Sequence, residues 1–95
     1  MPEGSQAYVF GSFLTTDQPE DIDVLILYDP SVCPPEGAYS AHALFAKNLR
    51  QLSGLPVDLT LLTYEEERSS RFIQDTKAVP IRKVDTNRPG SRPDQ

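Results

Sequence analysis

The sequence contains only one cysteine, Cys33, among its 95 residues. A single cysteine cannot form a disulfide within the chain, and we therefore expect a reducing, cytoplasmic environment. No apolar run approaches the length of about 18 residues that a transmembrane helix requires, so no membrane span is expected. Residues 1–7 also lack the basic start and apolar core of a secretory signal. These absences favour a soluble cytoplasmic protein.

Basic residues are missing from the first 40 positions, which contain seven acidic ones: Glu3, Asp17, Glu20, Asp21, Asp23, Asp29 and Glu36. All nine lysines and arginines follow, from Lys47 to Arg92. The net charge of −5 argues against broad nonspecific binding to nucleic acid. An acidic front half suits a site for hard divalent cations, although composition alone is equally compatible with a charge asymmetry that has no function.

Three apolar runs predict β-strands at Ala7–Phe10, Ile22–Tyr28 and Val57–Thr63. The second run is apolar on both faces, which predicts a central strand covered from both sides. A short fourth strand is expected within 78–84, at a sheet edge because Pro80 lacks an N–H group.

Two helices are expected between these strands. The first covers Ala41–Ser53, with Ser40 as N-cap, Gly54 as the stop and an apolar stripe formed by Ala41, Leu44, Phe45, Leu49 and Leu52. The second starts at the capping-box sequence that begins with Thr63 and continues to about Gln74. The predicted fold class is α+β (α/β-like), a small mixed β-sheet with two main helices.

The chain length fits one domain. Residues 86–95 combine two prolines and a glycine with polar side chains, a composition typical of a disordered tail. We therefore expect a single domain over residues 1–85.

Three aspartates are candidates for chemistry. Asp21 and Asp23 stand two apart at the start of a strand, so their side chains point to the same face. Asp58 lies within the third strand, where a carboxylate is costly unless it is paired or bound to a metal. If the two strands are neighbours, all three carboxylates can converge and hold Mg²⁺, which prefers oxygen ligands. Taken alone, the Asp21-Asp23 pair is more simply explained as a solvated acidic junction between a loop and a strand. Asp58 alone is more simply a side chain that caps another element or bonds to a backbone amide.

Gly11 and Ser12 follow the first strand. Glycine allows an anionic group to approach the backbone closely, so this turn can hold phosphate oxygens. Most Gly-Ser pairs are only turns, and the sequence is not a Walker A loop.

The Gly-Ser turn and the three aspartates, in this order along three strands, indicate a function far more specifically than any one of them does alone. The segment FGSFLTTDQPEDIDVLILYD resembles the Gly-Ser loop and metal-binding strand of the DNA-polymerase-beta nucleotidyltransferase superfamily, and LPVDLTLLT resembles the strand of its third carboxylate. The similarity runs from about Tyr8 to Thr63 and implies a minimal nucleotidyltransferase (MNT type) that moves a nucleoside monophosphate from an NTP, ATP being favoured, to a hydroxyl.

By this resemblance, Gly11 and Ser12 bind the nucleotide phosphates, while Asp21, Asp23 and Asp58 are the catalytic residues and ligands of two Mg²⁺ ions. The implied acceptor is a protein or RNA hydroxyl. Small relatives often act as antitoxins of HEPN-type toxins, so a HEPN-like partner or another complex subunit is expected. A homo-oligomer is also expected if both helices cover one sheet face and leave the other open, unless the loop at 29–39 closes it.

Several departures from the family pattern favour a second interpretation, a catalytically degenerate binding or regulatory subunit. The loop from Phe13 to Glu20 is short and lacks the Arg and second Gly that often follow the Gly-Ser pair. The helix that commonly precedes the first strand is also missing.

The remaining candidates are weaker. His42 is expected on the surface in the first turn of its helix, with substrate contact as the alternative. Five basic residues are interpreted mainly as ordinary surface charge, with contact to the triphosphate or an RNA acceptor as the alternative: Arg68, Arg71, Lys77, Arg82 and Lys83.

Overall fold

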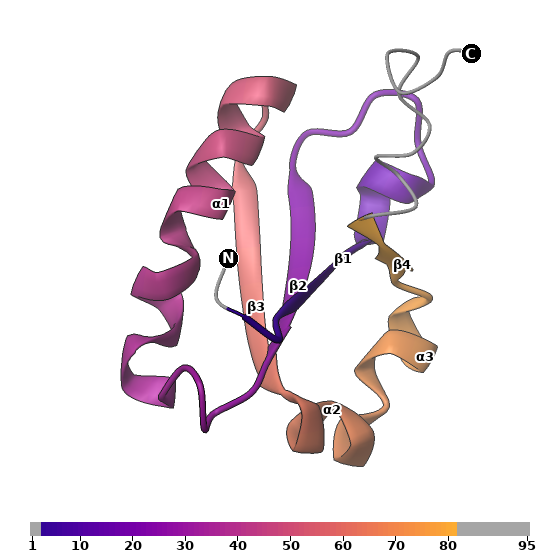
Figure 1. Ribbon diagram of the computed structural model, residues 1–95. Helices are drawn as coiled ribbons and strands as arrows, with labels where there is room; N and C mark the ends of the chain where they lie inside the picture. Colours follow the sequence, from indigo (N-terminus) through magenta and orange to yellow (C-terminus); the bar gives the residue numbers. More distant parts are fainter. Residues whose placement is uncertain (1–2, 82–95) are drawn as a thin grey trace, which may run out of the picture.

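A computed structural model describes residues 3–81 of the chain. Its elements are β1 (Gln6–Phe10), the 3-10 helix η1 (Gly11–Leu14), β2 (Ile22–Tyr28), the 3-10 helix η2 (Pro35–Gly37), α1 (Ala38–Ser53), β3 (Val57–Thr63), α2 (Tyr64–Ser70), α3 (Phe72–Thr76) and β4 (Val79–Pro80). Figure 1 shows the four strands between α1 on one side and α3 on the other. None of the helices within residues 3–81 is long and apolar enough to span a membrane.

The strands form one mixed sheet in the order β3-β2-β1-β4. β1 pairs antiparallel with both β2 and β4, whereas β2 and β3 are parallel. The parallel pair is connected through α1, as a crossover between parallel strands requires. The sheet confirms the predicted fold class and the adjacency of the two strands that carry the aspartates.

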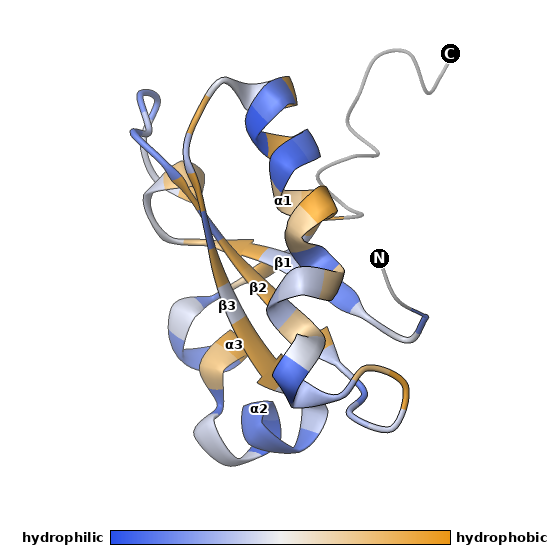
Figure 2. Cartoon of the chain, turned by 90° about the vertical axis from the view of Figure 1, so that its left-hand side faces the viewer, coloured by the Kyte–Doolittle hydropathy of each residue, from blue (hydrophilic) through white to orange (hydrophobic). Residues whose placement is uncertain are grey.

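β2 is buried on both faces, as its apolar sequence predicts. Val24 and Ile26 pack with Phe45 and Leu49 of α1, while Leu25, which points to the opposite face, is 0% exposed. Figure 2, in which α1 lies in front of the strands, colours most of the central strands as hydrophobic and α1 as a mixture of hydrophilic and hydrophobic residues.

The second face of the sheet is covered by the segment after β3. Phe10 lies opposite Asp23 and therefore shares its face, and the Phe10 ring makes an edge-to-face contact with Phe72 of α3 at 5.0 Å between centroids. α1 and the segment formed by α2 and α3 thus lie on opposite faces of the sheet. The condition attached to the homo-oligomer prediction, both helices on one face with the other left open, is therefore not met: Leu25 and Leu27 are buried within the chain itself.

The first helix starts earlier than predicted and is rotated about its axis. Gly37 rather than Ser40 precedes it, without a side-chain cap. The buried line is Ala38, His42 and Ala46, whereas two leucines of the predicted stripe are largely exposed, Leu44 at 66% and Leu52 at 85%. The small alanines let the helix lie close to the sheet. This close packing is favoured over burial of the larger side chains of Leu44 and Leu52. Gly54 ends the helix as expected, with φ 74°.

The predicted second helix is broken in two. Its capping box is present, because Thr63 accepts from the N–H of Glu66 and donates its own N–H to the Glu66 carboxylate. Arg71 then adopts a left-handed conformation with φ 57°, so α2 ends and α3 begins at Phe72. The redirection allows Phe72 to reach Phe10. Pro80 lies at the sheet edge as predicted, while residues 82–95, including the predicted tail, lie outside the described part of the chain.

Candidate metal centre

The two central strands bring Asp23 and Asp58 side by side. β2 and β3 are parallel and in register, and Asp23 is the direct partner of Asp58. Directly paired residues project to the same face of a sheet, so the two carboxylates share one face at the strands' N-terminal ends.

Asp21 lies just before β2 and completes the group. The N–H of the next residue, Ile22, donates to the carbonyl of Pro56 at 2.9 Å, which ties the start of β2 to the residue before β3. One carboxylate oxygen from each of Asp21, Asp23 and Asp58 lies within 4.8 Å of the others. Asp21 and Asp23 are half-buried and Asp58 is exposed, so the group is open to solvent on one side. Nothing in the sequence signals the role of Pro56, because it acts through its backbone carbonyl.

The three carboxylates repel one another. Partial burial raises the pKa of Asp23 above its ordinary value, and the charges of Asp21 and Asp58 raise that pKa further. The causes of this shift include no positive charge. An arrangement that gathers carboxylate oxygens and negative charge in one place offers the ligand type that a hard divalent ion such as Mg²⁺ prefers. The residues present therefore fit a divalent metal.

Gly11 adjoins the same centre from β1. It has φ 82°, a conformation that L-residues with a Cβ rarely adopt. A Cβ atom placed on Gly11 would overlap Oδ2 of Asp23 and lie 3.4 Å from its Cγ. Glycine is thus required here both for the turn and for the close approach of the backbone to the carboxylate.

Ser12 follows in the short helix η1, where it is exposed. Its carbonyl accepts from the N–H groups of Thr15 and Thr16, both at 3.0 Å, so the start of the loop is an ordered turn. Gly11 and the aspartates, which are separated in the sequence by the loop at 13–20, thus meet at one end of the sheet.

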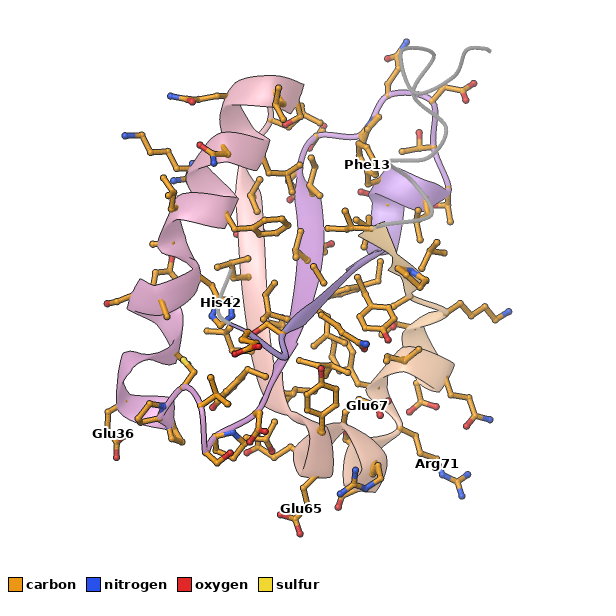
Figure 3. The ribbon with its side chains drawn as sticks, in the orientation of Figure 1. Phe13, Glu36, His42, Glu65, Glu67 and Arg71 are labelled. Atoms are coloured by element: carbon orange, nitrogen blue, oxygen red, sulfur yellow. The ribbon has the colours of Figure 1, made fainter. Side chains whose placement is uncertain are left out.

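Two of the basic residues lie at the other end. Arg68 belongs to α2 and Arg71 follows it, beyond the C-terminal end of β3, whereas Asp58 lies at the N-terminal end of this strand. A seven-residue strand spans about 20 Å. Figure 3 shows Phe13 of η1 and Arg71 at opposite ends of the molecule. Lys77 ends α3, and Arg82 and Lys83 lie outside the described residues.

The prediction for His42 is wrong. Its side chain is fully buried, with Nδ1 2.7 Å from the carbonyl of Ala38 and Nε2 3.0 Å from Oγ of Ser5. Its ring lies 6.3 Å from that of Tyr28, at the end of β2 remote from Asp23. A helix starting at Ala41 would have placed His42 in its exposed first turn. Because α1 instead starts at Ala38, His42 lies one turn further along and faces the sheet. His42 is a packing residue of the α1 layer and is separate from the aspartate group.

The comparison with known proteins agrees with this geometry. A family model described as a nucleotidyltransferase domain matches residues 2–82. No curated protein and no solved structure matches the chain significantly. The matched range contains β1 with the Gly-Ser turn, β2 and β3 with the three aspartates, and the helices on both faces of the sheet. The chain therefore belongs to the nucleotidyltransferase domain family.

Proposed function

We propose that this protein transfers a nucleoside monophosphate from an NTP, with ATP favoured, to a hydroxyl group on a protein or RNA acceptor. The observation that carries the proposal is the convergence of Asp21, Asp23 and Asp58 within 4.8 Å beside the turn at Gly11. The family match supports the general reaction, nucleotidyl transfer.

The turn and the aspartates have separate roles in this proposal. Gly11 and Ser12 offer a glycine backbone and a hydroxyl to the β- and γ-phosphates of the nucleotide. Asp21, Asp23 and Asp58 would hold two Mg²⁺ ions, which supply charge neutralisation at the attacking and leaving oxygens. Asp58 is the most exposed of the three and is open to an incoming acceptor.

The transfer itself is a displacement at the α-phosphorus. The acceptor oxygen forms a bond to this phosphorus, the bond between it and the oxygen bridging to the β-phosphate breaks, and pyrophosphate leaves. Asp58 accepts the proton of the attacking hydroxyl, since it lies on the open side of the group. Asp23 is half-buried and lies close to both other carboxylates, so it would be a ligand shared by the two metal ions.

The proposed physiological partner is a HEPN-type toxin, for which this protein would act as the antitoxin by modifying a hydroxyl on the toxin or its RNA. The small size of the domain and its resemblance to minimal nucleotidyltransferases support this context. A protein acceptor is favoured over free RNA because the net charge is −5.

A second candidate function is a non-catalytic binding subunit that retains the fold. The position of Arg68 and Arg71 favours it, because these cations are remote from the aspartates and do not neutralise a triphosphate held there.

One experiment separates the two functions. The protein is expressed with its genomic neighbour, purified, and incubated with Mg²⁺ and each of the four labelled NTPs, and the intact proteins and RNA are then examined by mass spectrometry. Addition of a nucleoside monophosphate that disappears with EDTA and in Asp58→Asn supports transfer. A stable complex that binds NTP and modifies nothing supports the binding subunit instead.

A further inference from the structure

β3 is an end strand of the sheet in the described part of the chain. All seven of its residues pair with β2 in continuous register, so it contains no bulge. Its sequence, Val-Asp-Leu-Thr-Leu-Leu-Thr, includes neither lysine nor proline. Natural proteins shorten, charge, kink or cover their edge strands, because a long regular edge pairs with other chains. β3 is neither short nor kinked, and its single charged residue, Asp58, belongs to the aspartate group. This indicates that the edge is covered by a partner.

The hydrogen-bonding groups on the free edge can be identified. The carbonyl of Pro56 points toward β2, because it accepts from Ile22. The N–H and C=O of one strand residue point to the same side, and the sides alternate along the strand. Asp58, Thr60 and Leu62 therefore bond to β2, while the backbone groups of Val57, Leu59, Leu61 and Thr63 face outward.

One of the outward groups is already in use. The N–H of Thr63 donates to the carboxylate of Glu66 in the capping box at 2.9 Å, which agrees with the outward direction derived for this residue. The N–H and C=O groups of Val57, Leu59 and Leu61 have no such partner among residues 3–81. Three consecutive outward-facing residues are thus available for pairing.

We propose that a second copy of this chain pairs with the free edge, β3 against β3 in antiparallel orientation, about a two-fold axis at Leu59. In this register Leu59 faces Leu59 of the partner subunit, and Val57 faces Leu61 of the partner subunit. Each such pair exchanges two hydrogen bonds, so the interface contains about six. The two four-stranded sheets become one continuous sheet, and the interface uses the same surface of both copies.

The side chains are self-complementary in this register. Leucines and valines meet on the face covered by α1, and no like charges stand opposite one another. Asp58 faces Thr60 of the partner subunit, as a pair without mutual backbone hydrogen bonds, in which side chains approach closely. Each group of three aspartates thereby gains a hydroxyl from the other copy. Registers centred on Thr60 or Leu61 would bring the occupied N–H of Thr63 into the interface, and they are disfavoured for this reason.

Single cysteine variants of the full chain test both the dimer and its register. Residues directly opposite one another in a hydrogen-bonded pair have Cα atoms about 5.5 Å apart, within the range of a disulfide. Under mild oxidation Leu59→Cys forms a covalent dimer, whereas Leu61→Cys, on the same edge and face, remains uncrosslinked. The buried Cys33 is common to all variants. Crosslinking of Leu61→Cys or Thr60→Cys in preference to Leu59→Cys overturns the proposed register.

Sedimentation equilibrium at micromolar concentration provides the second measurement. The unmodified protein sediments with twice the chain mass. Leu59→Pro removes an outward N–H without breaking the bonds to β2, and sediments as a monomer with an unchanged circular dichroism spectrum. If the unmodified protein stays monomeric and the Leu59→Cys variant fails to crosslink, the dimer is refuted. Neither measurement depends on nucleotidyl transfer, so the proposed function stands or falls separately.

Discussion

A Cβ atom on Gly11 would occupy the space of the Asp23 carboxylate. Gly11→Ala should therefore displace Asp23 and weaken Mg²⁺ binding, in addition to a cost of about 1–2 kcal/mol for a side chain at positive φ. Gly54→Ala is the matched control, because Gly54 has a similar φ of 74° and no atom within 4 Å of the added Cβ. Both variants should lose stability in thermal unfolding, but only Gly11→Ala should lose Mg²⁺ affinity in calorimetric titration. Equal affinity in the two variants would show that the contact with Asp23 is unimportant.

Repulsion within the aspartate group should make stability depend on pH. Burial, Asp21 and Asp58 raise the pKa of Asp23 in the folded protein above its ordinary value of 3.8. The metal-free protein therefore loses stability as the pH rises from this value through the raised pKa, because the folded state holds the proton more tightly than the unfolded state. Asp23→Asn should be more stable than the unmodified protein at neutral pH in EDTA, and this advantage should vanish below the ordinary pKa.

The same variant should respond differently to metal. Saturating Mg²⁺ should raise the melting temperature of the unmodified protein and leave that of Asp23→Asn nearly unchanged. Asp75→Asn, an exposed substitution on α3, serves as the control and should behave like the unmodified protein. A melting temperature of Asp23→Asn below that of the control at neutral pH in EDTA would contradict the repulsion.

Asp58→Asn should keep the fold and lose the reaction. Asp58 is exposed, and the substitution preserves shape while removing charge, so the circular dichroism spectrum should not change. Nucleotidyl transfer should fall by at least about a hundredfold, the scale expected when a group that stabilises transition-state charge is removed. Radiolabel incorporation into the co-purified acceptor provides the measurement, with Asp75→Asn again as the control. Full activity in Asp58→Asn would exclude its proposed role.

His42 should matter for stability and not for metal binding. His42→Ala removes buried contacts with Ala38 and Ser5 and leaves a cavity, at a cost of about 2–4 kcal/mol. Leu44→Ala on the same helix should cost less than about 0.5 kcal/mol, because Leu44 is 66% exposed. Urea unfolding measures both values. If folded His42→Ala binds Mg²⁺ several times more weakly, the residue is linked to the metal centre after all.

The break between α2 and α3 offers a route to higher stability. Arg71 has φ 57°, where glycine is not penalised, so Arg71→Gly should stabilise the protein by about 0.5–1 kcal/mol. Arg68→Gly, inside α2, should instead destabilise it by about 1 kcal/mol. Thermal unfolding of the two variants should therefore shift in opposite directions, and a loss of stability in both would argue against a strained Arg71.

The strands could be predicted from the sequence because their apolar runs are short, regular and bounded by glycine, proline or acidic residues. Side-chain alternation also placed Asp21 and Asp23 on one face. Their convergence with Asp58 required β2 and β3 to be parallel neighbours in register, and this is a property of the whole sheet that no local pattern contains.

The helices show where local patterns fail. Large apolar side chains suggested that Leu44 and Leu52 face the core, but close packing favoured Ala38 and Ala46, and the turn of α1 toward them buried His42. Likewise, no glycine or proline marks the break at Arg71. The contact between Phe10 and Phe72, distant in sequence, is the tertiary feature that accompanies it.

The pairing of β4 with β1 has a consequence for how the molecule opens. Val79 and Pro80 meet Tyr8 and Val9, so this contact closes a loop that includes almost the whole described chain, whereas β1, β2 and β3 are joined by much shorter connections. Long loops carry the larger closure entropy. We expect amide hydrogen exchange to be fastest at the β4 edge and slowest in β2, which is bonded on both sides. Local unfolding should therefore release β4 first, while Gly11, Asp23 and Asp58 remain in the most persistent unit of the sheet.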